Sequence, residues 1–317
     1  MGCNSFDFQC SQFCEYGWMV FGCGFRCCWW SLVDRLAVEM TSKVAVVKGE
    51  RGHEPVFKAL DLADYESALS GYERVLVKVN FICEKTWDLG ATTDPVVVEA
   101  IVKRIADLGL EVFVVESDAT ITNADKAYVK TGMKEMCERN GVKFVNLRYV
   151  KDKVKLVVPD GEALKTVTVP RLVVESAVVS AAKLKTHVNT DVTLGMKNMF
   201  GLLPDKFKAK YHAKGMSKVV VDINAVAKPV FTVVDGFVGM EGAGPIDGDP
   251  VRMDLIVAGK DVVAVDSTCC RIMGFDPHKV KHVWRAFERG LGEVDDITVV
   301  GEKVEDVMHM FKRAKQA

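Results

Sequence analysis

From residue 41 onward, short runs of β-branched and other apolar residues alternate with longer amphipathic segments. This alternation strongly constrains the fold, because a helix between two strands returns the chain to start the next strand parallel to the last. We therefore predict an α/β fold with a mainly parallel sheet flanked by helices, a β-hairpin insertion, and one or two lobes.

The individual elements follow from the period of the apolar residues. Strands are predicted over 44–47, 74–79, 111–116, 143–146, 177–181, 230–234, 255–258 and 297–300. Helices are predicted over 55–69, 95–109, 124–139, 216–226, 261–273, 277–289 and 304–313. Asp94 suits a helix N-cap and Pro95 a first helical turn. The runs 154–158 and 166–169 flank Pro159-Asp160-Gly161, a turn signal that predicts the hairpin insertion.

The first 39 residues are a different kind of sequence, with six of the ten cysteines and three of the five tryptophans. The apolar run 16–33 contains Arg26 and lacks the basic start and the small-residue cleavage site of a signal peptide. It is also shorter than the roughly 20 apolar residues of a membrane span. Met40 precedes a clean strand, which favours translation starting there. We therefore expect residues 1–39 to lie outside the fold and residues 40–317 to form the α/β domain.

The overall composition limits the partners. The chain is 49% apolar and 27% charged, as in folded globular proteins, and its formal net charge is −1. Nucleic acids and anionic membranes are normally bound through a large basic surplus, which this chain lacks. We expect neither as a partner of residues 40–317, and we predict a cytoplasmic location with anion binding confined to a local site.

The densest polar cluster is the segment 185–201, which follows the strand predicted over 177–181. Ligands of α/β sheets bind beyond the carboxyl ends of strands, where Lys185 and His187 are expected to lie. His187 can serve as general acid, general base or metal ligand, whereas Lys185 and Lys197 can neutralise a carboxylate or a phosphate. The alternative is that His187 caps backbone groups and that Lys197-Asn198 lies on a solvated helix face.

A basic segment follows this cluster, with Lys206, Lys208, Lys210, Tyr211, His212 and Lys214. One interpretation is a lid that closes on an anionic substrate, with His212 as a proton carrier. The simpler alternative is a mobile surface loop with ordinary lysines, which we favour for the individual lysines.

Three segments of the first half are expected at the same sheet edge. Lys78 and Asn80 stand at the end of one predicted strand, and residues 116–118 end another. Asp94 starts a helix and is interpreted as its cap. We therefore predict Lys78 and Asn80 as ligand-binding residues.

The segment 235–245 is rich in glycine and follows the strand predicted over 230–234. Gly242 and Gly244 allow a backbone to approach a ligand closely and to form an anion nest. Asp235 and Glu241 add carboxylates that can bind a divalent metal or move protons. The alternative for the glycines is a tight turn. Asp266, on an apolar helix, is interpreted either as a buried hydrogen-bonding acid or as a site residue.

The cysteines do not predict a ferredoxin-type cluster. Such clusters need runs like C-x2-C-x2-C-x3-C-P, which deliver several thiolates from one loop, and no such run occurs. Reduced structural thiols are the expected form of the dispersed cysteines Cys83, Cys137, Cys269 and Cys270.

Five of these motifs, taken in order, resemble the domain-of-unknown-function 362 family over roughly residues 43–291. They are Lys185-Thr186-His187, Gly195-Met196-Lys197-Asn198 with Phe200-Gly201, Tyr211-His212, Asp235-Gly236, and Met240-Glu241-Gly242 with Gly244-Pro245. Some members of that family are described as iron–sulfur-binding because they carry an added ferredoxin-like module. This sequence lacks that module, which puts cluster binding in doubt. A fainter pattern, from His187 to Lys197, resembles the nickel-pincer lactate racemases.

The residues together predict an enzyme that binds a small anionic substrate and uses Lys/His acid–base or metal-assisted chemistry, as in a racemase, isomerase or lyase. The predicted catalytic residues are His187, His212 and Lys197. The predicted substrate-binding residues are Lys78, Asn80, Lys185, Asn198, Gly242 and Gly244, and Asp235 and Glu241 are the metal candidates. Two alternatives stay open, an iron–sulfur or other redox-metal accessory protein and a non-catalytic metabolite-binding protein.

Overall fold

The main sheet follows from the valine-rich runs, which are buried on both faces as parallel strands usually are. The structure is a computed structural model that describes residues 41–314, so the prediction for residues 1–39 lies outside the described part of the chain. Within that part, the sheet has nine strands: β1 (Ser42–Lys48), β2 (Arg74–Lys78), β3 (Glu111–Glu116), β4 (Lys143–Asn146), β7 (Ala177–His187), β8 (Asp191–Val192), β9 (Phe231–Glu241), β10 (Asp249–Gly259) and β11 (Ile297–Gly301).

The strand order is β11-β1-β10-β9-β7-β2-β3-β4, with β8 paired to β7. Most neighbours are parallel, and β10 runs antiparallel to both β9 and β1. The short connection between β9 and β10 explains this reversal, because a parallel return needs a crossover of a dozen or more residues. The predicted mainly parallel α/β sheet is confirmed.

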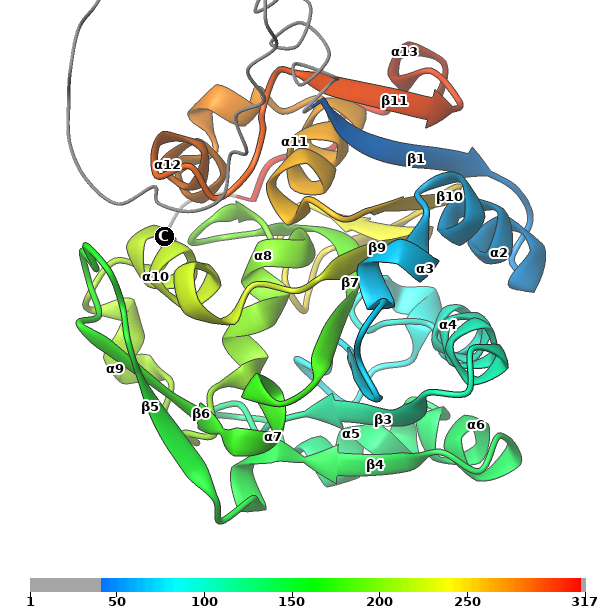
Figure 1. The fold of residues 1–317 in the computed structure, drawn as a ribbon. Coiled ribbons are helices and arrows are strands. Elements are labelled where there is room, and N and C mark those ends of the chain that lie inside the picture. Colours follow the sequence, from blue (N-terminus) through cyan, green and yellow to red (C-terminus); the bar gives the residue numbers. More distant parts are fainter. Residues whose placement is uncertain (1–40, 315–317) are drawn as a thin grey trace, which may run out of the picture. The chain divides into compact units, whose positions relative to one another are not determined.

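Helices cover both faces of the sheet (Figure 1). Each face of the sheet has its own hydrophobic core. Side chains along a strand alternate between the two faces, so Ala45 and Val47 of β1 lie in the first core and Val44 and Val46 lie in the second. The first core is covered by α2 (His53–Leu62), α3 (Tyr65–Leu69), α4 (Pro95–Asp107), α5 (Ala124–Lys130) and α6 (Met133–Arg139). The second is covered by α7 (Arg171–Val174), α8 (Leu194–Asn198), α9 (Ala209–His212), α10 (Met216–Ala227), α11 (Val262–Ile272), α12 (Lys281–Glu288) and α13 (Val304–Val307).

Short 3₁₀ turns and the predicted hairpin complete the described residues. The turns are η1 (Trp87–Leu89), η2 (Leu147–Tyr149), η3 (Met199–Leu202) and η4 (Pro277–Lys279). The hairpin consists of β5 (Lys153–Val157) and β6 (Thr166–Pro170), which pair antiparallel as predicted. All these elements belong to one compact unit. None of the helices described is long and apolar enough to cross a lipid bilayer.

Several predicted helices are shorter than their apolar period suggests. The helix predicted over 55–69 is interrupted at Asp64, which has a left-handed φ of 55°, and the helix predicted over 124–139 is interrupted at Gly132 with φ 80°. The last helix ends at Val307 because the following backbone bonds elsewhere: the N–H groups of His309 and Phe311 donate to carbonyls near the end of α11.

Two strands are longer than predicted, and this changes the site. β7 continues to His187 instead of ending near residue 181, and β9 continues to Glu241 instead of ending at 234. The extension of β7 pairs with β9 at Lys185↔Met240 and with β8 at His187↔Asp191. Lys185 and His187 therefore lie within a buried strand rather than in a loop beyond it.

Candidate functional site

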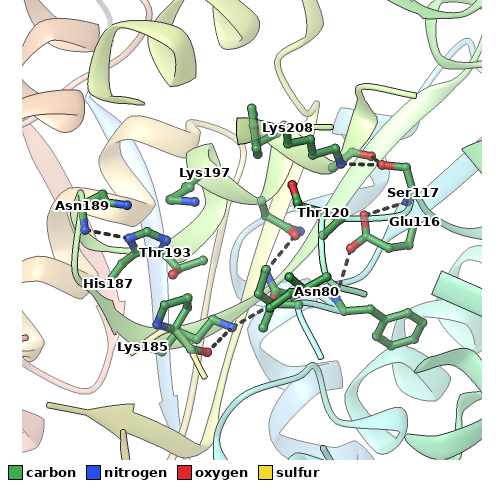
Figure 2. Close-up of a pocket in the computed structure, with 18 of the residues that line it drawn as sticks. Asn80, Glu116, Ser117, Thr120, Lys185, His187, Asn189, Thr193, Lys197 and Lys208 are labelled. Atoms are coloured by element: carbon green, nitrogen blue, oxygen red, sulfur yellow. Dashed lines mark hydrogen bonds between the residues drawn. The ribbon is translucent and has the colours of Figure 1, made fainter. Parts of the chain in front are cut away.

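A cavity of about 410 Å³ lies at the carboxyl ends of the parallel strands β2 and β3, beside the extended part of β7 (Figure 2). Its polar lining is Lys78, Asn80, Glu116, Ser117, Thr120, Lys185, His187, Asn189, Thr193, Lys197, Asn198, Lys208 and His212. Its remaining lining is Phe81, Ile82, Ala119, Ile121, Val188, Phe200, Gly201, Ala209 and Pro245. This is the place where α/β sheets usually bind ligands. The sequence-predicted residues brought together here are Lys78, Asn80, Lys185, His187, Lys197, Asn198 and His212.

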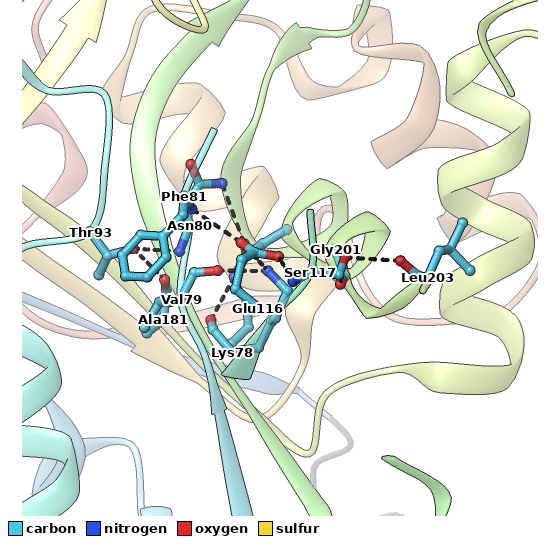
Figure 3. Close-up of polar contacts among 12 residues, drawn as sticks. Lys78, Val79, Asn80, Phe81, Thr93, Glu116, Ser117, Ala181, Gly201 and Leu203 are labelled. Carbon is cyan, nitrogen blue, oxygen red and sulfur yellow. Dashed lines mark hydrogen bonds and ion pairs between the residues drawn. The ribbon is translucent and has the colours of Figure 1, made fainter. Parts of the chain in front are cut away.

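Lys78 forms a buried ion pair in the floor of the cavity (Figure 3). Its ammonium group donates to Glu116 Oε2 at 2.8 Å, to the Val79 carbonyl at 2.6 Å and to Asn198 Oδ1 at 3.2 Å. Burial lowers the pKa of Lys78, and the Glu116 charge opposes that shift. All three donors of Lys78 are used inside the protein, so its charge is already balanced.

Gly201 allows this ion pair to pack under η3, the 3₁₀ turn that follows α8. A Cβ at that position would lie 2.2 Å from Glu116 Oε1 and 2.4 Å from Lys78 Nζ. The glycine of the Phe200-Gly201 motif is therefore explained by close packing against the ion pair.

Lys185 is fully buried and contacts neutral oxygens. Its ammonium group donates to Asn80 Oδ1 at 2.8 Å, to the Ala91 carbonyl and to the Pro245 carbonyl at 3.3 Å. Burial lowers the pKa of Lys185 to about 7. Asn80 in turn donates to Asn198 Oδ1 at 3.3 Å, which connects Lys185 to the floor. Lys185 therefore joins β7 to two loops, and its donors are used.

Lys197 differs from both, because it has no hydrogen-bond or ion-pair partner within residues 41–314. Its Nζ lies 5.6 Å from the centroid of the Phe200 ring, and Lys208 Nζ lies 5.4 Å from the same ring. Lys208 donates to Ser117 Oγ at 2.7 Å. Burial lowers the pKa of Lys197 and of Lys208 to about 8 each, and the Lys208 charge adds to the shift of Lys197.

The two histidines are connected through Asn189. The Asn189 N–H donates to His187 Nδ1 at 3.0 Å, so the neutral ring carries its proton on Nε2. Burial, followed by the charges of Lys197 and Lys185, lowers the pKa of His187 strongly and keeps the ring neutral. His212 is exposed and lies 3.3 Å from the Asn189 amide, measured from Nδ1 to Nδ2. Burial and the Lys197 charge lower its pKa as well.

The short helix α8 places Lys197, and Asp266 on α11 holds that helix. The Asp266 carboxylate accepts from the N–H of Gly195 at 2.7 Å and from the N–H of Met196 at 2.9 Å. Burial raises the pKa of Asp266 to about 8, and the two N–H donors act in the opposite direction. A Cβ at Gly195 would lie 2.9 Å from Asp266 Oδ1 and 2.7 Å from Thr232 Cγ2. Gly195 is therefore the residue that allows α8 to reach this carboxylate.

The predicted glycine nest does not form at the cavity. The Gly242 N–H donates to the Lys312 carbonyl, and the Gly244 N–H donates to the Gly242 carbonyl. A Cβ at Gly244 would lie 2.2 Å from the Thr186 carbonyl oxygen. These glycines form a tight turn against β7, because their N–H groups are used within the protein and neither lines the cavity.

The predicted metal candidates are also placed outside the cavity. Asp235 accepts from Lys183 Nζ at 2.7 Å and from the N–H groups of Asp94 and Phe237. Glu241 pairs with Lys312, whose Nζ lies 2.9 Å from Oε1. In the described part of the chain, no three His, Cys, Asp or Glu side chains are grouped so that they could hold a metal ion. Asp235 lies opposite Lys183 of the neighbouring strand, and Glu241 meets Lys312 of the segment that follows α13.

The sequence does not predict the burial of two lysines in this region. The sequence favours an ordinary surface lysine at Lys208, but Lys208 is 5% exposed and lines the cavity. Lys183, which the buried Asp235 requires, was not singled out. The signal for Lys183 was its place two residues before Lys185 on an otherwise apolar strand, whereas the burial of Lys208 depends on Ser117 and leaves no local pattern.

Comparisons with known proteins agree with the family resemblance. The thylakoid-associated protein sll1697 of Synechocystis sp. is 26% identical over 216 residues, which is 65% of this chain and 64% of the relative. The match thus spans less than two thirds of that relative's length. No solved structure was found to match. The resemblance to nickel-pincer lactate racemases is not shown by these comparisons. A family model matches residues 75–271, more than half of the sequence, and the chain therefore belongs to the family described as domain of unknown function (DUF362).

Proposed function

We propose that the cavity binds a small organic anion and that the protein is an enzyme transferring a proton on it. The observation that carries this proposal is Lys197, a cation in the cavity without a partner among the described residues, beside Lys208 and the neutral His187. A carboxylate or a phosphate would supply the acceptor that Lys197 lacks.

The charge balance of the cavity supports an anionic ligand. Four lysines line it, and Glu116 is the carboxylate among its lining residues. Glu116 balances Lys78, which leaves Lys185, Lys197 and Lys208 without a carboxylate partner in the lining. An anion beside these lysines would raise their pKa values, so binding near pH 8 is expected to take up protons.

The pKa values suit proton transfer. A catalytic acid works best with a pKa near the working pH, and burial lowers the pKa of Lys197 to about 8, so the charged Lys197 can bind the anion and donate a proton to it. The Nε2–H of His187 can donate to an oxygen on which negative charge develops, and its neutral ring keeps that role across the usual pH range. His212 at the edge of the cavity can carry a proton to solvent. This is the step that racemases, isomerases and lyases share.

Asp235 and Glu241 have no part in this proposal, since their carboxylates are bound by Lys183 and Lys312. The iron–sulfur alternative, the small-molecule partner and the cytoplasmic location stay predictions. The Synechocystis relative is named as thylakoid-associated.

Binding is tested with inorganic phosphate as the probe, by isothermal titration of the full chain at pH 7. The Lys197→Met variant is expected to bind about 10- to 100-fold more weakly, because a hydrogen bond to a charged group contributes about 1.5–3 kcal/mol. Lys206→Met is the matched control, since Lys206 is an exposed lysine nine residues further along the chain and does not line the cavity. Equal affinities of the two variants would contradict the proposal.

Catalysis is tested by incubating the protein in D₂O with a panel of small carboxylates and phosphate esters and following exchange of carbon-bound hydrogen by NMR. Exchange that the wild type catalyses and Lys197→Met does not is the expected result. Binding without exchange across the panel would favour the non-catalytic metabolite-binding alternative.

A further inference from the structure

The lining of the cavity is polar at its floor, and at its mouth two isoleucines lie among the exposed polar residues Thr120, Asn189 and His212. The floor consists of strand residues such as Lys78 and Lys185, which are 1% and 0% exposed. Ile82 and Ile121 belong to the loops that follow β2 and β3, so they lie beyond the strand ends. Ile121 is 80% exposed although it lines the cavity. A ligand that reaches these two isoleucines would therefore contact apolar side chains.

The middle of the cavity combines charge with an aromatic ring. Lys197 and Lys208 place their ammonium groups 5.6 Å and 5.4 Å from the centroid of Phe200. Both cations keep free donors, because Lys197 has no partner within residues 41–314 and Lys208 uses one donor on Ser117. An anionic group that meets these lysines would lie near a ring that also offers apolar surface.

The size of the cavity exceeds what an inorganic anion needs. A volume of about 410 Å³ falls in the range of pockets that enclose organic ligands, roughly 300–1,000 Å³. Phosphate fills the volume of only a few water molecules, each of which occupies about 30 Å³ in the liquid. With phosphate bound, Ile82 and Ile121 would still contact water. Covering an exposed isoleucine with an apolar group is favourable.

We propose that the ligand is an amphipathic organic anion. Its phosphate or carboxylate head binds Lys197 and Lys208, and its apolar chain or ring lies against Phe200 and extends to Ile82 and Ile121 at the mouth. This inference rests on the proposed function for the anionic head and adds the apolar body, which the acid–base argument does not require.

The test measures the affinity of the full chain for two homologous series, the n-alkyl phosphates and the n-alkyl carboxylates, from methyl to hexyl, with inorganic phosphate as reference. Affinity is expected to rise about fourfold for each methylene that is buried. The series with the tighter binding identifies the head group. Ile121→Ser is expected to weaken binding of the hexyl member about tenfold and to leave inorganic phosphate unchanged. Val157→Ser is the matched control, because Val157 is 74% exposed on β5, away from the cavity lining.

The outcomes separate this inference from the proposed function. If the affinity is the same along both series and the Lys197→Met variant still loses binding of inorganic phosphate, the proposed apolar body of the ligand is wrong. The anion site is then retained. If the affinity rises with chain length equally in the wild type and in Ile121→Ser, the proposed contact between the apolar chain and Ile121 is wrong. Failure of every member and of phosphate to bind would overturn both proposals.

Discussion

Four lysines share one cavity but differ in their partners, and at the scale of the residue this difference decides their roles. Lys78 is balanced by Glu116, and Lys185 is held by three neutral oxygens. Lys197 has neither kind of partner within the described residues, and Lys208 has one hydroxyl. Because burial lowers the pKa of a lysine whatever its role, the unused donors, more than the burial, mark the residue that can meet a ligand.

The pKa of Lys197 gives a prediction on pH. The charged form predominates below pH 8 and is lost as the pH rises through 8, so phosphate binding should weaken above that pH. Competitive acetylation of the native protein, read by mass spectrometry at Lys197, should show a midpoint near 8. Saturating phosphate should move that midpoint upward. A midpoint near the ordinary lysine value of about 10.4 would contradict the assignment.

At the scale of the element, α8 is too short to be stable as an isolated helix. It has five residues and begins at Leu194 with a left-handed φ of 48°, whereas isolated helices need about 12–15 residues to be even marginally stable in water. Asp266 supplies the missing stabilisation by accepting from two N–H groups of its first turn. The position of Lys197 therefore depends on a carboxylate that is 69 residues further along the chain.

Asp266→Ala should show this dependence. We expect the free energy of unfolding to fall by about 2–6 kcal/mol, because two buried N–H groups lose their acceptor at about 1–3 kcal/mol each. Phosphate affinity should fall as well, since α8 is no longer fixed. Urea unfolding and titration measure the two effects. Asp306→Ala, at an exposed position on α13, should change neither; an unchanged Asp266→Ala protein would mean that α8 is held by packing alone.

At the scale of the whole molecule, a chain of charged groups ties the sheet together beside the cavity. Lys183 of β7 and Asp235 of β9 form an ion pair with both side chains fully buried. The Asp94 N–H donates to Asp235, and Arg51 pairs with the Asp94 carboxylate at 2.6 Å and stacks on Trp87. The central strands, the start of α4 and the segment after β1 are thereby joined.

Removing one member of the buried pair should be costly. Asp235→Ala leaves Lys183 without its counter-ion in the core, and we expect a loss of about 3–5 kcal/mol in the free energy of unfolding. Asp249→Ala is the control, because Asp249 pairs with Lys312 at the surface, where such pairs contribute about 0–1 kcal/mol. Chemical denaturation of both variants checks this. Similar losses in the two would mean that the buried pair adds no special stability.

The sequence by itself determined the class of fold, the position of most strands and helices and the family. These properties depend on local patterns, such as the apolar period and the Asp94-Pro95 helix start, which α4 confirms. It also indicated the neighbourhood of the candidate site, because the carboxyl ends of parallel strands meet at one sheet edge.

Only the tertiary structure decided which polar residues are free. Lys78 meets Glu116 across 38 residues and Lys185 meets Asn80 across 105. No local pattern records such partners. The same holds for Lys208, for the carboxylates bound by Lys183 and Lys312, and for the glycines whose N–H groups are already used. The identity of a residue states what it can bind, whereas long-range packing determines whether its donors and acceptors remain available.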